Sequence, residues 1–167
     1  GAQEYFGVTP DLSIFAKGIS NGMPLSCYLG KAEIMDRVKD TVISSTFGGD
    51  TLALAAAKAV IDFYTTEPVI DTLWARGKQL HQGFHEHCQR LGVPAKFRGL
   101  PPLGMLSFEH SNSSDLLTRF QAELLKRGVI PYSVYYTNFS HTEADIQEVI
   151  AVMADALETM ANEALFD

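Results

Sequence analysis

The chain has 167 residues, of which 46% are apolar and 20% charged, and its formal net charge is −7. This length fits one domain, or one domain with part of another, and the apolar residues suffice for a core without disulfides. The negative charge argues against nucleic acid or an anionic membrane as the main partner, because both reward clustered Lys and Arg. No apolar run is long enough to span a membrane. Cys27 and Cys88 lack the spacing of a disulfide framework, so we expect free thiols and a cytoplasmic location.

Short apolar runs and glycine-rich turns make up the first third of the chain. It opens on Gly1 without an initiator Met, and we expect it to be a fragment of a longer protein. The apolar runs predict strands over residues 12–16 and 25–29, separated by a turn at Asn21-Gly22-Met23-Pro24. A short helix is expected over residues 31–38.

Two long helical patterns follow. Asp50 or Thr51 is expected to cap the first, whose apolar residues recur at steps of three and four. The second is expected to begin near Thr66, with Pro68 in its first turn, and to end at Gly92-Val93-Pro94. Both patterns predict amphipathic helices that pack against a core.

Short strands and separate helices are predicted for the last third. Strands are expected at residues 105–108 and 129–130, and a helix over residues 113–127 that Gly128 closes. Thr142 is expected to cap the last helix, which carries an apolar stripe. This change of pattern places a domain boundary within the long helices, with the end of an α/β domain before it and a small α+β domain after it.

Lys17 is the first residue whose position indicates chemistry. It follows an apolar strand and is flanked by Gly18 and Gly22. A lysine at a strand end can project into a cleft, where loss of solvent favours the neutral amine that attacks a carbonyl carbon to form a Schiff base. The alternative is a surface lysine at a strand end, which is the commoner setting for a single lysine.

The segment from Ser44 to Asp50 is a second candidate site. Hydroxyls and glycines directly before a helix can hold a phosphate, because backbone N–H groups and the helix dipole favour negative charge there. The alternative is a loop that only caps the helix. Asp50 is an objection to the anion site, since its carboxylate would repel a phosphate placed close to it.

These two segments together match a known pattern in order and spacing. The first runs from Asp11-Leu12 through a strand to Lys17 and on to the turn Gly22-Met23-Pro24, and residues 30–36 continue as a helix. The second reads Ser45-Thr46-Phe47-Gly48-Gly49-Asp50-Thr51-Leu52-Ala53. Both resemble the class III aminotransferases, which use pyridoxal phosphate (PLP) and whose second motif is Thr-[Phe/Tyr]-Gly-Gly-Asn-Pro-Leu-Ala. Asp50 and Thr51 depart from its Asn and Pro.

The C-terminal half is similar to the small domain of glutamate-semialdehyde aminomutases. Residues 128–130 and 139–146 carry the likeness, the latter through a Ser-x-Thr-Glu-x-Asp helix start. Many aminotransferases bind the substrate α-carboxylate with a late Arg before Pro-Pro-Leu, and no such stretch occurs near the C-terminus. The likeness therefore favours the aminomutase branch, or a relative like the sugar aminotransferases.

The resemblance implies a fold-type-I PLP transferase of the α/β class. Residues 1–68 are then the end of the large PLP-binding domain, including the cofactor-lysine strand, and residues 69–167 the small C-terminal α+β domain. Lys17 is implied to be the catalytic residue that forms the Schiff base with PLP and then moves a proton between substrate and cofactor. Thr46, with Ser45 beside it, is implied to bind the PLP phosphate.

Partners and activity follow from the same resemblance. In the family this threonine serves the cofactor held mainly by the neighbouring subunit, which implies a homodimer with shared active sites. The implied reaction is amino-group transfer on a small amino or keto substrate, of the glutamate-1-semialdehyde aminomutase kind. The alternative is a truncated, non-catalytic, dimer-forming fragment. The pyridine-nitrogen Asp, the stacking aromatic residue and the Gly-rich phosphate loop of the family all precede this segment.

A histidine-rich helix face is the main competing signal. At about 100° per residue, His81, His85 and Cys88 share one face, and all are zinc-ligand types. The set has no fourth ligand nearby, and His87 points elsewhere. A solvated, partly polar face is therefore the preferred interpretation, and no metal site is predicted.

Four aromatic residues and one arginine are further candidates for contact with a substrate. Tyr132, Tyr135, Tyr136 and Phe139 are predicted to lie in a loop before the last helix. Packing on the small-domain sheet is preferred to lining a substrate entrance. For Arg98, contact with a substrate carboxylate and a plain surface position both stay open.

Overall fold

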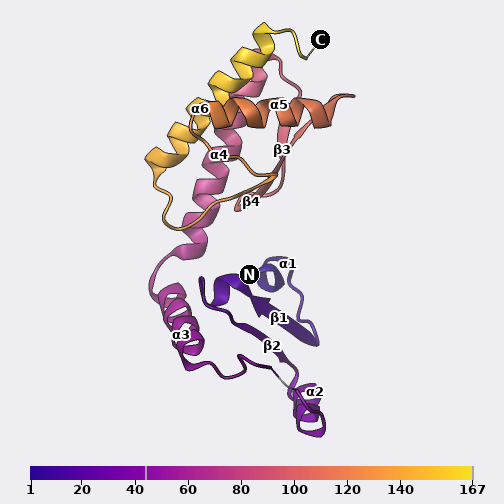
Figure 1. The fold of residues 1–167 in the computed structure, drawn as a ribbon, viewed down its shortest axis with the longest axis vertical. Coiled ribbons are helices and arrows are strands. Elements are labelled where there is room, and N and C mark those ends of the chain that lie inside the picture. The colour runs from indigo at the N-terminus through magenta and orange to yellow at the C-terminus, as the bar shows by residue number, and fades with distance from the viewer. Residues whose placement is uncertain (44, 167) are drawn as a thin grey trace. The chain divides into compact units, whose positions relative to one another are not determined.

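The computed structural model describes residues 1–43 and 45–166, so Ser44, the first residue of the candidate anion segment, lies outside the described residues, as does Asp167. The chain divides into two compact units, Gly1–Glu67 and Pro68–Asp167 (Figure 1). The division falls between two long helices. None of the helices in the described part of the chain is long and apolar enough to cross a membrane.

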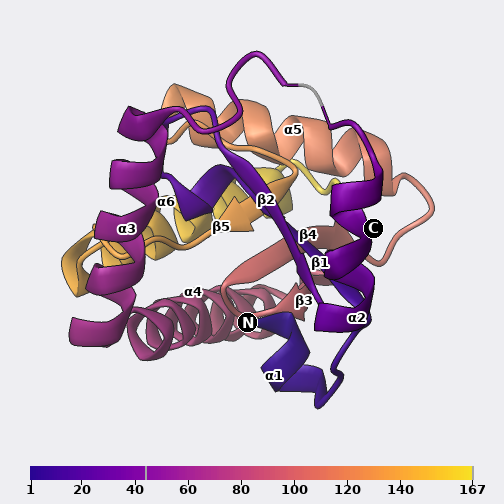
Figure 2. The same cartoon turned by 90° about the horizontal axis from the view of Figure 1, so that it is seen from below.

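The first unit is built on a two-stranded hairpin. Strand β1 (Leu12–Ala16) pairs antiparallel with β2 (Ser26–Gly30). Among the described residues of this unit, five helical segments lie around the strands, namely α1 (Ala2–Phe6), η1 (Lys17–Ile19), α2 (Ala32–Met35), η2 (Asp36–Asp40) and α3 (Thr51–Thr66). Figure 2 shows α2 and α3 on opposite sides of the hairpin. Both expected strands are present, whereas the helix expected over residues 31–38 is divided between α2 and η2.

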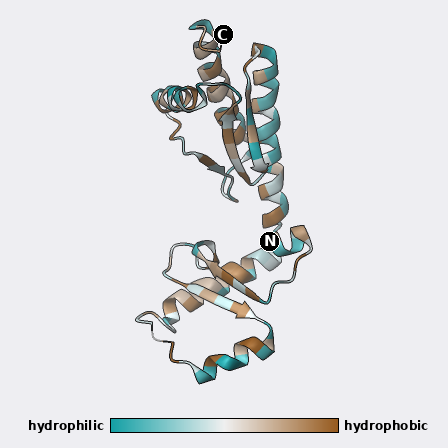
Figure 3. Ribbon diagram, turned by 90° about the vertical axis from the view of Figure 1, so that its right-hand side faces the viewer, coloured by the Kyte–Doolittle hydropathy of each residue, from teal (hydrophilic) through white to brown (hydrophobic). Residues whose placement is uncertain are grey.

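This unit buries few apolar side chains. Among its described residues only Ala53 and Ala57 of α3 belong to the buried apolar set. On the hairpin, Ile14 is 81% exposed and its cross-strand partner Tyr28 is exposed as well. Figure 3 shows hydrophobic residues over the strands and α3 of this unit. A two-stranded hairpin that buries few side chains is marginally stable in water, and its exposed apolar residues form a candidate surface for association.

The second unit is a three-stranded antiparallel sheet covered by helices. Its elements are α4 (Val69–Leu91), β3 (Ala95–Leu100), β4 (Leu103–Phe108), α5 (Ser113–Lys126), β5 (Val134–Tyr136) and α6 (Glu143–Asn162). The strand order is β3-β4-β5. Along β4, Gly104, Leu106 and Phe108 are buried while Leu103 and Met105 are exposed, so one face carries the core and the other is open.

A single hydrophobic core joins the helices to the sheet. It includes Phe84 of α4, Phe108 of β4, Phe120 of α5 and Leu157 of α6. The ring of Phe120 meets those of Phe84 and Phe108 edge to face, with centroids 6.0 and 5.9 Å apart. Burial of each such side chain contributes about 1.5–3 kcal/mol. This unit therefore has the core that the first unit lacks.

Residues close in sequence determine where several of the helices begin or end. Thr142 accepts the N–H of Asp145 at 3.1 Å, and Asp145 accepts the N–H of Thr142 at 2.7 Å, which is a capping box and confirms Thr142 as the cap of α6. Gly92 and Gly128 follow α4 and α5 with φ of +68° and +85°, as expected for residues that end a helix.

The strand expected at residues 129–130 is wrong. The N–H of Val129 donates back to the carbonyl of Leu124 at 3.0 Å, as part of the end of α5. Pro131 has no N–H to offer a strand ladder, and Ile130 is 87% exposed. The third strand forms instead at β5, which pairs with the open side of β4.

The start of α4 also differs from expectation. The helix begins at Val69 rather than near Thr66, with Pro68 as its N-cap. Glu67 is extended, with φ −111° and ψ 148°. A proline disfavours helical backbone at the residue before it, which explains the break between α3 and α4.

Two glycines of α4 lie where the helix packs closely against other parts of the second unit. A Cβ at Gly77 would lie 2.1 Å from the carbonyl oxygen of Pro101, whereas one at Gly83 would meet the end of the Ile150 side chain at 2.6 Å. Alanine is favoured over glycine inside a helix by about 1 kcal/mol. Gly77→Ala is still expected to lower the free energy of unfolding by about 1–3 kcal/mol, because backbone atoms cannot move aside. Gly83→Ala is expected to be close to neutral. Urea unfolding checks this, and equal losses in the two variants would contradict it.

Glu123 is a buried carboxylate in a cluster of cations. It is 3% exposed and binds Lys126 at 2.7 Å, together with Arg119 of the same helix, α5, and Arg127 directly after that helix. Arg119 also binds Glu163 at 2.8 Å. The hydrogen bonds from Lys126, Arg119 and Arg127 lower the pKa of Glu123 to about 2. The charged form is therefore favoured in the folded chain.

The low pKa of Glu123 predicts an acid-dependent loss of stability. Its contribution is present above the ordinary carboxyl pKa of 4.5 and is lost as the pH falls toward about 2. Glu123→Gln should lower the urea midpoint at pH 7, and its difference from the original chain should shrink between these pH values. Glu158→Gln, which removes an exposed pair with Arg90, should change the midpoint little. A difference for Glu123→Gln that does not vary with pH would contradict this account.

Candidate active site

Lys17 lies where β1 ends, as the first residue of η1. Its φ is +55°, in the left-handed region. That conformation costs a residue with a Cβ about 1–2 kcal/mol, so glycine would be preferred here on stability alone. Backbone strain of this kind is concentrated at functional sites. The position of the lysine follows from the sequence pattern, whereas its strained backbone does not.

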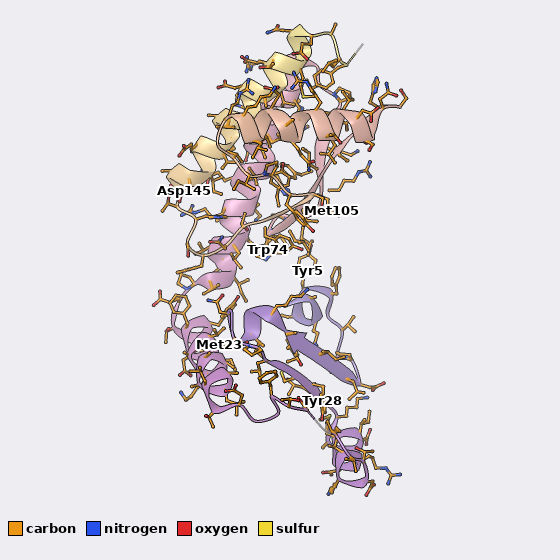
Figure 4. The ribbon with its side chains drawn as sticks, viewed as in Figure 1. Tyr5, Met23, Tyr28, Trp74, Met105 and Asp145 are labelled. Atoms are coloured by element: carbon orange, nitrogen blue, oxygen red, sulfur yellow. The ribbon has the colours of Figure 1, made fainter. Side chains whose placement is uncertain are left out.

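An open hollow of about 400 Å³ lies beside this lysine. It is lined by Lys17, Gly18, Asn21, Gly22, Met23 and Pro24. Figure 4 labels Met23 on this turn. The Lys17 side chain is exposed, and among the described residues its amino group has no ion-pair or hydrogen-bond partner. A primary amine in this state is available to react with an aldehyde.

The residues that line the hollow belong to one tight turn. The N–H of Ser20 donates to the carbonyl of Lys17 at 3.3 Å, and the N–H of Met23 donates to the carbonyl of Ser20 at 3.3 Å. Helix α3 contacts η1, and the buried residues of α3 are the small Ala53 and Ala57, one helical turn apart. Helix α3 therefore lies against the segment that begins at Lys17.

The second candidate segment is an exposed turn before α3. Ser45 and Thr46 are both exposed. Asp50 Oδ1 accepts the N–H groups of Leu52 at 2.9 Å and Ala53 at 3.2 Å, which confirms Asp50 as the cap of α3. These N–H groups are thus already occupied by a carboxylate. An anion in this segment would have to use the hydroxyls of Ser45 and Thr46.

The two candidate segments do not share a hollow. Both belong to the first unit. The lining of the Lys17 hollow, however, includes neither Ser45 nor Thr46. Within the described part of one chain, the hydroxyls of Ser45 and Thr46 therefore do not line the hollow beside the Lys17 amine.

The histidine-rich face of α4 does not form a ligand set. Cys88 is 2% exposed in the hydrophobic core, and burial raises the pKa of its thiol to about 12. The ring of His81 stacks on Phe97 with centroids 4.4 Å apart, and burial lowers its pKa. His85 is exposed. Across residues 1–43 and 45–166, no three His, Cys, Asp or Glu gather in a way that could hold a metal ion.

Tyr135 and Arg98 have structural partners, whereas Tyr132 and Tyr136 are 70% and 63% exposed, so the packing expected for these two tyrosines is wrong. Tyr135 lies in β5 rather than in the expected loop, and its ring meets Phe97 edge to face at 5.2 Å. Burial raises the pKa of this tyrosine. Arg98 is exposed and donates to Ser107 at 3.0 Å and Glu109 at 3.2 Å. These contacts favour packing for Tyr135 and a surface position for Arg98.

Solved structures of PLP-dependent transferases share the fold of this chain. The FumI protein of Sphingopyxis sp. MTA144, in its PLP internal aldimine form, has a TM-score of 0.92 at 25% identity, over 98% of this chain and 40% of that chain. An omega-transaminase from Sphaerobacter thermophilus has a TM-score of 0.81 at 23% identity, over 95% of this chain and 40% of that chain. The fold is therefore part of a PLP transferase.

The chain belongs to the class-III aminotransferase family, whose model matches residues 1–157. It is 30% identical to 3-aminobutyryl-CoA aminotransferase of Cloacimonas acidaminovorans (strain Evry), over 94% of this chain and 39% of the relative. It is 31% identical to glutamate-1-semialdehyde 2,1-aminomutase of Methanococcoides burtonii, over 92% of this chain and 40% of the relative. The chain thus spans about 40% of the length of these relatives. Family and fold both indicate PLP as the cofactor.

Proposed function

We propose that this chain supplies the lysine-bearing part of a PLP-dependent enzyme that transfers amino groups, and that Lys17 binds the cofactor covalently. The observation that carries the proposal is the exposed amino group of Lys17, unpaired among the described residues, at a strained turn after β1. Lysines in ion pairs, such as Lys31 with Asp11 at 2.6 Å, are less available to an aldehyde. Among the described residues, Lys17 has no such partner.

The residues of this chain suit two parts of the cofactor. Lys17 offers the amine for the aldehyde carbon, and Ser45 and Thr46 offer hydroxyl donors for the phosphate. PLP, when bound, supplies an electron-withdrawing ring that stabilises negative charge on the substrate carbon. The part proposed for Lys17 is to hold a proton at Nζ and to move it to or from that carbon. An amine suits this task because it is both a nucleophile and a base.

We propose a homodimer with shared active sites. Ser45 and Thr46 lie outside the hollow of Lys17, which suits a site completed by a second chain. The resemblance of the Thr46 segment to the family motif supports the same arrangement. A symmetric dimer would bring the hydroxyls of one chain to the lysine of the other.

The reaction we propose is amino-group transfer of the glutamate-1-semialdehyde aminomutase kind, on a small amino or keto substrate. The likeness of residues 128–130 and 139–146 and the identity with the Methanococcoides burtonii aminomutase support it. The similar identity with an aminotransferase supports transfer to an external acceptor instead. An aminomutase isomerises its substrate without an added keto acceptor, which separates the two in an assay. The free thiols of Cys27 and Cys88 support a cytoplasmic location.

A second candidate function is a non-catalytic, dimer-forming fragment. The exposed apolar surface of the first unit favours it, because association would cover that surface. The share of the relatives' length that the chain spans is also compatible with it.

One experiment decides between the two. The chain is mixed with PLP and reduced with borohydride, and pyridoxyl adducts are located by peptide mass spectrometry. An adduct confined to Lys17 supports the proposed cofactor lysine. Adducts spread over the other lysines, such as Lys39 and Lys58, contradict it and favour the non-catalytic fragment.

A further inference from the structure

Ser20 is a buried polar side chain in a unit that buries little else. It is 1% exposed, and the buried apolar residues among the described part of this unit are Ala53 and Ala57. A buried hydroxyl is costly unless it has a hydrogen-bond partner. Ser20 Oγ donates to the carbonyl of Met23 at 2.6 Å. The hydroxyl therefore has a specific structural partner, and that partner lines the lysine hollow.

Three hydrogen bonds of Ser20 connect the two sides of the hollow. Its N–H binds the carbonyl of Lys17, its carbonyl accepts the N–H of Met23, and its hydroxyl binds the carbonyl of Met23. Ser20 does not line the hollow, although residues on both sides of it in the chain do. Ser20 can therefore fix the positions of the residues that line the hollow without itself contacting a molecule bound there.

The turn that Ser20 holds is strained. Lys17, Asn21 and Gly22 have φ of +55°, +43° and +109°. The first two carry a Cβ, and left-handed backbone is unfavourable for such residues. Without a tether, these residues would relax toward ordinary backbone. The side chain of Lys17 would then leave its place beside the hollow.

We propose that Ser20 is a positioning residue for Lys17, whose buried hydroxyl fixes the turn that presents Nζ at the hollow. This inference rests on the proposed function of Lys17. Helix α3 contacts η1, the segment that begins at Lys17 and directly precedes the buried Ser20.

Ser20→Ala tests the proposal, because it removes the hydroxyl and leaves the size of the side chain nearly unchanged. The chain is treated with PLP and borohydride, and the adduct at Lys17 is measured relative to that at Lys58 in the same sample. Loss of one buried hydrogen bond is expected to lower this ratio by about tenfold. Ser20→Thr keeps the hydroxyl and is expected to retain most of the ratio. Ser13→Ala removes another hydroxyl of the same unit, one that accepts from Gln3 at 2.5 Å, and should leave the ratio unchanged.

The outcomes separate this inference from the function on which it rests. A Ser20→Ala chain that keeps the original ratio overturns the role of Ser20 and leaves the cofactor lysine standing. An original chain with no preference for Lys17 overturns the cofactor lysine and the role of Ser20 together. Hydrogen exchange of β1 and β2 is measured alongside. If Ser20→Ala speeds exchange throughout both strands, or Ser13→Ala lowers the ratio equally, Ser20 acts on the whole unit and the positioning role is wrong.

Discussion

Lys17→Arg is expected to abolish the pyridoxyl adduct at position 17 while leaving the fold unchanged. Arginine keeps the positive charge and a side chain of similar length, but its guanidinium stays protonated and offers no neutral amine. The backbone strain at φ +55° is the same for both residues, so stability should not change. In an enzyme completed by the rest of the protein, loss of the proposed proton carrier should lower kcat by about 10²–10⁴-fold or more. Borohydride trapping and steady-state kinetics measure the two effects.

Lys58→Arg is the matched control for this change. Lys58 is also an exposed lysine of the first unit, but its Nζ lies 2.5 Å from Asp62 on the next turn of α3. The exchange should leave the adduct at Lys17 and the kinetics unaltered. Lys17 is not the cofactor lysine if the Lys17→Arg chain gives the same total yield of pyridoxyl adduct as the original chain, formed at other lysines. The same conclusion follows if the variant has the same kcat as the original chain.

We expect the chain to associate with a second copy through its first unit. At rising concentration, hydrogen exchange in β1, β2 and α3 is expected to slow by about tenfold or more as a partner covers the exposed apolar surface. Exchange in the core of the second unit should be slow and independent of concentration, because Phe84, Phe120 and Leu157 are buried within one chain. Sedimentation measures the mass of the associated species over the same range. The trapping experiments on Lys17 are best made where association is complete.

Ile14→Lys and Ile130→Lys form a matched pair for the association surface. The first places a charge on the hairpin at a residue that is exposed beside Tyr28, and the second does so at an equally exposed residue of the second unit. Ile14→Lys should weaken association and restore fast exchange in β1 and β2. Ile130→Lys should change neither. A chain that stays monomeric at all concentrations, or that responds equally to both variants, would show that this surface does not drive association.

The ends of helices could be predicted from the sequence because their causes are local. Asp50 caps α3 and Thr142 caps α6 through groups two or three residues away, and Gly92 and Gly128 end their helices through their own backbone freedom. The strand before Lys17 and the resemblance to the family also depend on short, continuous segments of the sequence. For these features the sequence was enough, and the family model and the related structures agree with the assignment.

The tertiary structure alone decided which residues the fold would pair or bury. Residues 129–130 are apolar like residues in a strand, but the N–H of Val129 binds the end of α5, and residues 134–136 pair with β4 instead. The spacing of His81, His85 and Cys88 places them on one helix face, but Cys88 is buried in the hydrophobic core and does not join a ligand set. The strained backbone of Lys17 and the buried hydroxyl of Ser20 had no local signal either. Strand pairing and burial depend on neighbours that are distant in sequence, and no short pattern can specify them.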